Sequence, residues 1–146
     1  MIEERDLNQL KKVFKKYPIL GAYVYGSKVS GKTSALSDLD IGILLKKSVS
    51  PKRYFDLQLK IQNNLGEIFR NETIDLVILN EASPLLAQNV VSKGKLVFSD
   101  NKSKLVDFAC QTLKKFDDTF FLRQTFYYYL KQRALQGKLG ETNYER

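Results

Sequence analysis

The amino-acid sequence predicts an α/β (α+β) fold in which a small mixed β-sheet is flanked by helices. Segments with helical spacing of apolar residues alternate with short apolar runs that are typical of strands. The 146 residues suit one domain, and 43% hydrophobic with 27% charged residues is an ordinary balance for a globular protein. We therefore expect a single domain over residues 1–136, followed by a flexible tail over residues 137–146.

Each element follows from its apolar spacing and from the residues that begin or end it. Apolar residues three and four positions apart indicate helices, and β-branched or aromatic runs indicate strands. Pro18 ends the first helix, whereas Pro51 and Pro84 can each begin one. The expected elements are a helix over 2–17, strands over 19–25 and 39–45, a helix over 51–70, a strand over 73–79, a helix over 83–94, a strand over 95–98 and a helical region from about 101 to 136.

The long C-terminal helical region has no proline to interrupt it, and its apolar residues recur every three or four positions. We expect Phe120 and Phe121 to lie in the core. Cys110 is expected to be a small core residue. Residues 127–129 are three consecutive tyrosines, which on a helix point in different directions, so we expect a mixture of packing and exposure.

The composition excludes several classes of site. The chain has no histidine and one cysteine, so histidine-dependent nucleophile systems, imidazole zinc sites and intrachain disulfides are excluded. The formal net charge of +8 gives mild support for a phosphate-bearing partner. The charged N-terminus does not resemble a signal peptide, and no stretch is long and apolar enough for a membrane span. We therefore expect a cytoplasmic protein without a membrane partner.

Gly26 and Ser27 follow the first predicted strand directly. Glycine allows the backbone to approach a ligand closely, and the free N–H groups of a turn that starts a helix can bind phosphate. The Ser27 hydroxyl and the nearby Lys28 would add donors. Taken alone, a Gly-Ser pair is more often an ordinary turn.

Three carboxylates form the second feature. Asp38 and Asp40 are two residues apart at the start of a predicted strand, so extended backbone there would point their side chains to the same face. Two such close carboxylates repel each other unless a cation lies between them, and oxygen ligands suit Mg²⁺. Asp75 alternates with apolar residues in the next strand, where a buried acid needs a partner or a metal. Taken alone, Asp38-x-Asp40 is more often a polar strand end that faces solvent, and Asp75 can be an acid at the open end of an edge strand.

The combination of Gly26-Ser27, ten further residues, Asp38-x-Asp40 and an acid in the following strand resembles the DNA polymerase β-like nucleotidyltransferase superfamily. Within it, the short chain resembles the minimal nucleotidyltransferase (MNT) antitoxins of HEPN/MNT toxin–antitoxin pairs. The resemblance implies that Gly26, Ser27 and Lys28 bind the triphosphate of ATP. It also implies that Asp38, Asp40 and Asp75 are catalytic and hold two Mg²⁺ ions, or Mn²⁺. Relatives often have Arg where this chain has Lys28, which contacts phosphate as a point charge.

The resemblance thus predicts a metal-dependent nucleotidyltransferase that moves AMP from ATP to a tyrosine hydroxyl of a cognate HEPN ribonuclease toxin. Nucleic acid is not expected as the direct substrate. Two alternatives stay open at this point. The chain can be a small-molecule nucleotidyltransferase of the aminoglycoside type, or a non-catalytic antitoxin that acts by binding alone.

Overall fold

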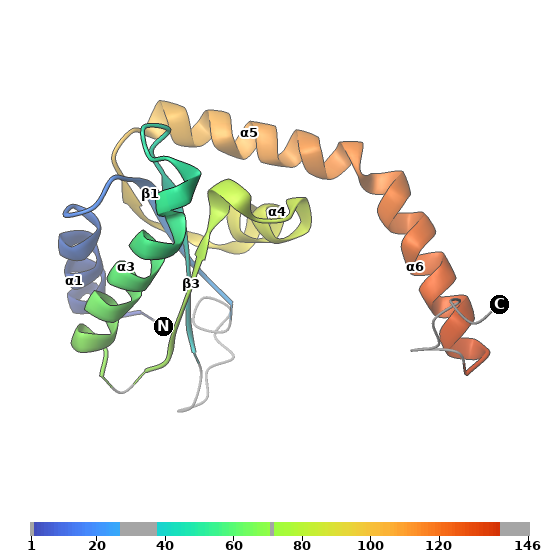
Figure 1. Cartoon of the computed structure of the whole chain (residues 1–146), viewed down its shortest axis with the longest axis horizontal. Helices are drawn as coiled ribbons and strands as arrows, with labels where there is room; N and C mark the ends of the chain where they lie inside the picture. Colours follow the sequence, from blue (N-terminus) through green and yellow to red (C-terminus); the bar gives the residue numbers. More distant parts are fainter. Residues whose placement is uncertain (1, 27–37, 71, 138–146) are drawn as a thin grey trace.

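A four-stranded mixed sheet forms the centre of the computed structural model, which describes residues 2–26, 38–70 and 72–137 (Figure 1). The strands are β1 (Ile19–Tyr25), β2 (Leu39–Leu45), β3 (Ile74–Ile78) and β4 (Lys95–Ser99). Their order in the sheet is β3-β2-β1-β4, with β2 and β3 parallel and the other neighbours antiparallel. The predicted fold class is therefore confirmed.

Helices cover both faces of this sheet. On one face, α1 (Glu4–Phe14) and α3 (Tyr54–Ile68), which follows a short 3-10 turn at Pro51–Arg53, bury apolar side chains against alternate residues of the strands. On the other face, α4 (Pro84–Lys93) and α5 (Lys102–Asp118) pack on the intervening residues. Because successive strand residues point to opposite faces, Ile41 and Ile43 meet α1 and α3, whereas Asp40 and Leu44 belong to the α4 and α5 face.

Side-chain amides fix β3 in place beside β2. Gln58 and Gln62 on α3 donate hydrogen bonds to the carbonyl oxygens of Leu76 and Ile74, at 2.6 and 2.9 Å. After β3, the amide of Asn80 accepts from the Leu45 N–H at 2.8 Å and donates to the Leu45 carbonyl at 3.0 Å. These bonds satisfy backbone groups at both ends of the strand pair, so they hold its register.

The predicted C-terminal helical region consists of two helices. α5 ends at Asp118, and its C-cap Thr119 leads into α6 (Phe120–Leu135). The Thr119 hydroxyl donates to the Phe116 carbonyl at 3.0 Å and accepts a hydrogen bond from the Arg123 guanidinium. That guanidinium also lies 3.6 Å from the centre of the Phe116 ring. A threonine hydroxyl bonded back to the preceding turn is a known cause of bending.

Two expectations about the core are wrong. Phe120 and Phe121 are 47% and 81% exposed, and Cys110 is exposed as well. Figure 1 gives the reason for the two phenylalanines, because α6 leaves the end of α5 and lies apart from the sheet. Apolar spacing identified a helix but could not show that α6 has no buried residue among the residues that the structure describes. Residues 138–146 of the predicted tail lie outside the described residues. No helix in the described ranges is long and apolar enough to cross a membrane.

Candidate active site

The ends of three neighbouring strands bring the predicted carboxylates together. Asp40 on β2 is the register partner of Tyr25 on the antiparallel β1 and of Asp75 on the parallel β3. Register partners project from the same face, which here is the face covered by α4 and α5. Asp38 lies two residues before Asp40, at the entrance to β2, where the Leu39 N–H donates to the Thr73 carbonyl at 2.8 Å.

Gly26 ends β1 directly beside Asp40. Its φ of +77° is a conformation that side chains disfavour, and a Cβ built there would lie 2.3 Å from Oδ2 of Asp40. The residue must therefore be glycine for two reasons, its backbone conformation and its contact with the carboxylate. The sequence predicted that the backbone at Gly26 approaches a phosphate closely. The structure shows in addition that Gly26 lies close to the carboxylate of Asp40.

The carboxylates repel one another. Burial raises the pKa of Asp40 above its ordinary value, and the negative charges of Asp75 and then Asp38 raise it further. Asp38 and Asp75 are exposed, whereas Asp40 is half-buried, so the group is open to a ligand from solvent. Among the described residues, this end of the sheet therefore brings like negative charges together, which a cation would neutralise.

Tyr25 is a neighbour that the sequence did not single out. It is half-buried beside the carboxylates, and burial together with the charges of Asp40 and Asp75 raises its pKa to about 12. Its hydroxyl therefore remains protonated at neutral pH and can act as a hydrogen-bond donor but not as a base. Strand alternation could place Tyr25 on one face, but only the register of β1 against β2 shows that Asp40 is its partner.

The structure does not describe every residue of the predicted site, and the acids that it describes do not form a complete metal site. Ser27 and Lys28 lie outside the described residues. Within residues 2–26, 38–70 and 72–137, no three acidic, cysteine or histidine side chains are already close enough to hold one ion. Asp38, Asp40 and Asp75 therefore meet at one end of the sheet without forming a finished metal cage. This openness is compatible with Mg²⁺, which keeps waters and substrate phosphates among its ligands.

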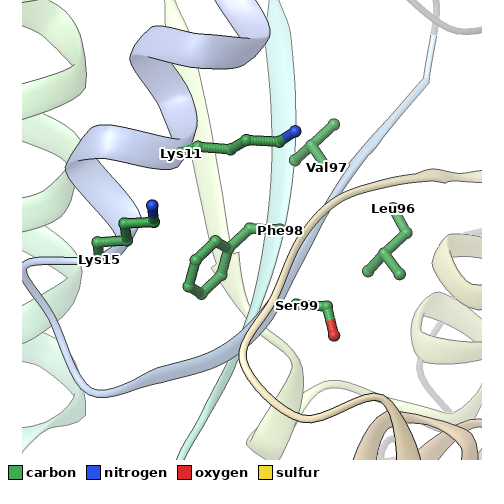
Figure 2. A pocket seen from close by; sticks show the side chains of 6 residues that line it. All are labelled: Lys11, Lys15, Leu96, Val97, Phe98 and Ser99. Atoms are coloured by element: carbon green, nitrogen blue, oxygen red, sulfur yellow. The ribbon is translucent and has the colours of Figure 1, made fainter.

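A separate hollow of about 340 Å³ lies between α1 and β4 (Figure 2). It is lined by Lys11 and Lys15 of α1 and by residues 96–99 of β4. None of these residues belongs to the strand ends that bear the aspartates. We therefore do not assign it to the candidate active site.

The chain is similar to known nucleotidyltransferases. The family model described as polymerase beta, nucleotidyltransferase matches residues 8–103, which include the acid-bearing strands. The protein adenylyltransferase MntA of Aphanizomenon flos-aquae (strain 2012/KM1/D3) is 33% identical over 109 residues, which cover 65% of this chain and 68% of the relative.

Solved structures share the fold. A chain of a toxin–antitoxin crystallised with AMP-PNP superposes with a TM-score of 0.73 at 23% identity, covering 86% of this chain and 98% of that chain. A chain from a complex between a tri-AMPylated Shewanella oneidensis HEPN toxin and an MNT antitoxin gives a TM-score of 0.71 at 20% identity, covering 89% and 99%. At these sequence identities the similarity establishes the fold alone. That fold is the polymerase β-like nucleotidyltransferase fold that the sequence resemblance predicts.

Proposed function

The chain belongs to the polymerase beta nucleotidyltransferase family, and from this premise we propose that it is an antitoxin that transfers AMP from ATP to a tyrosine hydroxyl of a cognate HEPN ribonuclease. One observation carries the proposal: Asp40 has Asp75 as its register partner and Gly26 against its carboxylate, with Asp38 two residues away. The similarity to a protein adenylyltransferase favours a protein acceptor over a small molecule.

The donor set fits a divalent cation. All three candidate ligands are carboxylates, and their mutual repulsion raises the pKa of Asp40. Oxygen ligands suit Mg²⁺ or Mn²⁺. We propose that Asp38, Asp40 and Asp75 hold two such ions. When bound, they would neutralise the charge on the transferring phosphate and lower the pKa of the attacking hydroxyl.

The remaining steps belong to the chain's own residues. The backbone at Gly26, with Ser27 and Lys28, holds the triphosphate of ATP. The tyrosine oxygen of the acceptor bonds to the α-phosphorus, the bond from that phosphorus to the pyrophosphate oxygen breaks, and the hydroxyl proton passes to Asp75 or to solvent. Holding both reactants in line converts the reaction into an effectively unimolecular step.

The modification would silence the acceptor by charge and bulk. An AMP group attached to a tyrosine adds a phosphodiester anion and a nucleoside. Beside an RNA-cleaving centre, that anion repels the RNA phosphates and the nucleoside occupies their path. The inhibition would then persist after the two proteins separate. We place this reaction in the cytoplasm, where ATP and cellular RNA are both available.

The position of a radioactive label tests the reaction class. Incubation with the HEPN protein and Mg²⁺ is expected to label that protein from ATP labelled at the α-phosphate and not from ATP labelled at the γ-phosphate. Omission of the metal is expected to abolish labelling. Label from the γ-phosphate would identify a kinase, and no label from either would contradict transfer.

We expect Ser27→Ala to weaken ATP binding more than it slows the chemical step. The hydroxyl would contact phosphates that are bound both before and during reaction, so most of its contribution is uniform binding. The KM for ATP should rise by roughly tenfold with a smaller fall in kcat, because one hydrogen bond to a charged group contributes about 1.5–3 kcal/mol. Steady-state kinetics decides between the two effects. A large fall in kcat at constant KM would instead place Ser27 in the transition state.

A further inference from the structure

α6 is the most apolar exposed surface in the described part of the chain. None of its 16 residues is buried. Its six aromatic side chains are between 47% and 81% exposed, and they are Phe120, Phe121, Phe126 and the three tyrosines Tyr127 to Tyr129. An isolated helix of this length is marginal in water, and aromatic residues are not strong helix formers. Exposed apolar surface of this extent indicates a site of protein interaction.

The apolar residues occupy several sides of α6 rather than one stripe. Phe121, Tyr128 and Leu135 are seven residues apart and share one side. Leu122 and Phe126 are four apart and, with Tyr129, lie about a quarter turn or more away. Polar residues lie between them, so α6 has apolar side chains on several sides without being apolar all round. A partner that lay along only one side of α6 would leave the other side in water.

Area and charge point to a different protein rather than a second copy. At about 200 Å² for each aromatic side chain, the exposed rings of α6 offer roughly 700 Å², close to the ~800 Å² per partner of a standard interface. Residues 119–137 contain Arg123, Lys131 and Arg133 but no acid. If the α6 helices of two copies packed against each other, like charges would be brought together. Each helix would also cover only one side of the other. An occupant with an apolar interior and acidic rim fits better.

The placement of α6 suits a partner that also reaches the active site. Figure 1 shows α5 leading away from the sheet and α6 turning from the end of α5, apart from the sheet and on the same side of it as α4. α4 packs on the sheet face to which the aspartates belong. The match to the toxin–antitoxin with AMP-PNP covers 86% of this chain, more than all residues before α5 supply, so the shared fold extends into the C-terminal helices.

We propose that α6 is the docking arm for the acceptor protein, inserted between elements of that partner and enclosed by it on at least two sides. The inference rests on the proposed function for the identity of the partner, the HEPN ribonuclease. The bend fixed by Thr119 and Arg123 then directs the enclosed arm so that the acceptor lies beside Asp40 and Asp75. α6 acts in positioning and takes no part in the chemistry.

Two double variants test docking and enclosure together. Phe121→Ala/Tyr128→Ala removes one side of the arm and Leu122→Ala/Phe126→Ala removes another, and alanine is the best helix former, so the helix is retained. Phe55→Ala, at an aromatic residue on α3 that is 70% exposed, is the matched control. The dissociation constant for the HEPN protein is measured without ATP by calorimetry, and far-UV circular dichroism checks that helicity is retained.

We expect each double variant to bind at least ~10-fold more weakly, as loss of two interface aromatic or apolar anchors does, and the control to bind normally. At saturating HEPN protein both variants should regain the unaltered kcat, because the arm does not touch the reacting atoms. Binding weakened by only one double variant would overturn enclosure. Normal binding by both, or no binding by the unaltered chain, would overturn docking.

Two further measurements separate the remaining outcomes. Sedimentation of the chain alone should give a monomer, and a dimer that both double variants dissociate would show that a second copy covers α6, which overturns the proposal. Label transfer from α-labelled ATP by the unaltered chain judges the enzyme activity independently. The docking role of α6 can therefore be refuted while the proposed function stands. The proposed function can likewise be refuted while the docking role stands.

Discussion

Asp40→Asn is expected to reduce AMP transfer by on the order of a thousandfold while the protein remains folded, and Asp38→Asn to act similarly. Each substitution removes one of the anionic ligands that we propose for the metal, which would also orient the triphosphate. Initial rates with saturating ATP and Mg²⁺ measure the effect. Asp107→Asn, at an exposed acid on α5, is the matched control and should keep full activity. Full activity in the Asp40→Asn protein would refute the assignment.

The Asp40→Asn substitution is also expected to change the stability of the metal-free protein in a defined direction. Burial and the neighbouring Asp75 and Asp38 raise the pKa of Asp40 in the folded protein, so folding favours its neutral form. That contribution is present below the ordinary pKa of an aspartate and is lost as the pH rises through the raised value. Asparagine is neutral at every pH. Without metal at pH 7, the Tm of Asp40→Asn should therefore equal or exceed that of the unaltered protein, and the difference should shrink toward pH 4.

Addition of Mg²⁺ should reverse the comparison. A cation that binds only the folded protein raises its Tm by mass action, and it should do so for the unaltered chain but not for the variant. Scanning calorimetry in both buffers measures this. A metal-free variant that melts well below the unaltered chain would mean that Asp40 stabilises the fold, and its loss of activity would then be explained by unfolding.

Gly26→Ala is expected to lower both stability and transfer. The left-handed conformation costs a side chain about 1–2 kcal/mol, and the added Cβ would meet the Asp40 carboxylate at 2.3 Å. Asp40 must then turn away, and misplacement of a reacting geometry by about 1 Å can cost on the order of a hundredfold in rate. Thermal melts and transfer rates are measured on the same preparations.

Gly137→Ala separates these two causes. Gly137 has a φ of +69°, but nothing lies within 4 Å of a Cβ placed there. This control shares the backbone penalty without the contact, so it should retain full transfer. If Gly26→Ala also kept full transfer, the close approach of Gly26 to Asp40 would not matter for catalysis.

The sequence predicted the parts of the site that depend on local pattern. Strand alternation predicted that Asp38 and Asp40 share a face, and the apolar neighbours of Asp75 identified its strand. Pairing between strands is not local, so the register that places Tyr25 and Asp75 at Asp40 came only from the structure. The same limit explains α6, because helical spacing does not identify what covers a helix, and the Thr119 bend depends on side-chain bonds to Phe116 and Arg123.

The most direct test of the account mixes the HEPN ribonuclease with ATP, Mg²⁺ and either the unaltered chain or the Asp38→Asn/Asp40→Asn variant. After the proteins are separated, the intact mass of the ribonuclease and its rate of RNA cleavage are measured. We expect a lasting gain of whole AMP units and loss of cleavage with the unaltered chain only. Equal neutralisation by the variant, without any gain in mass, would contradict it and leave an antitoxin that acts by binding.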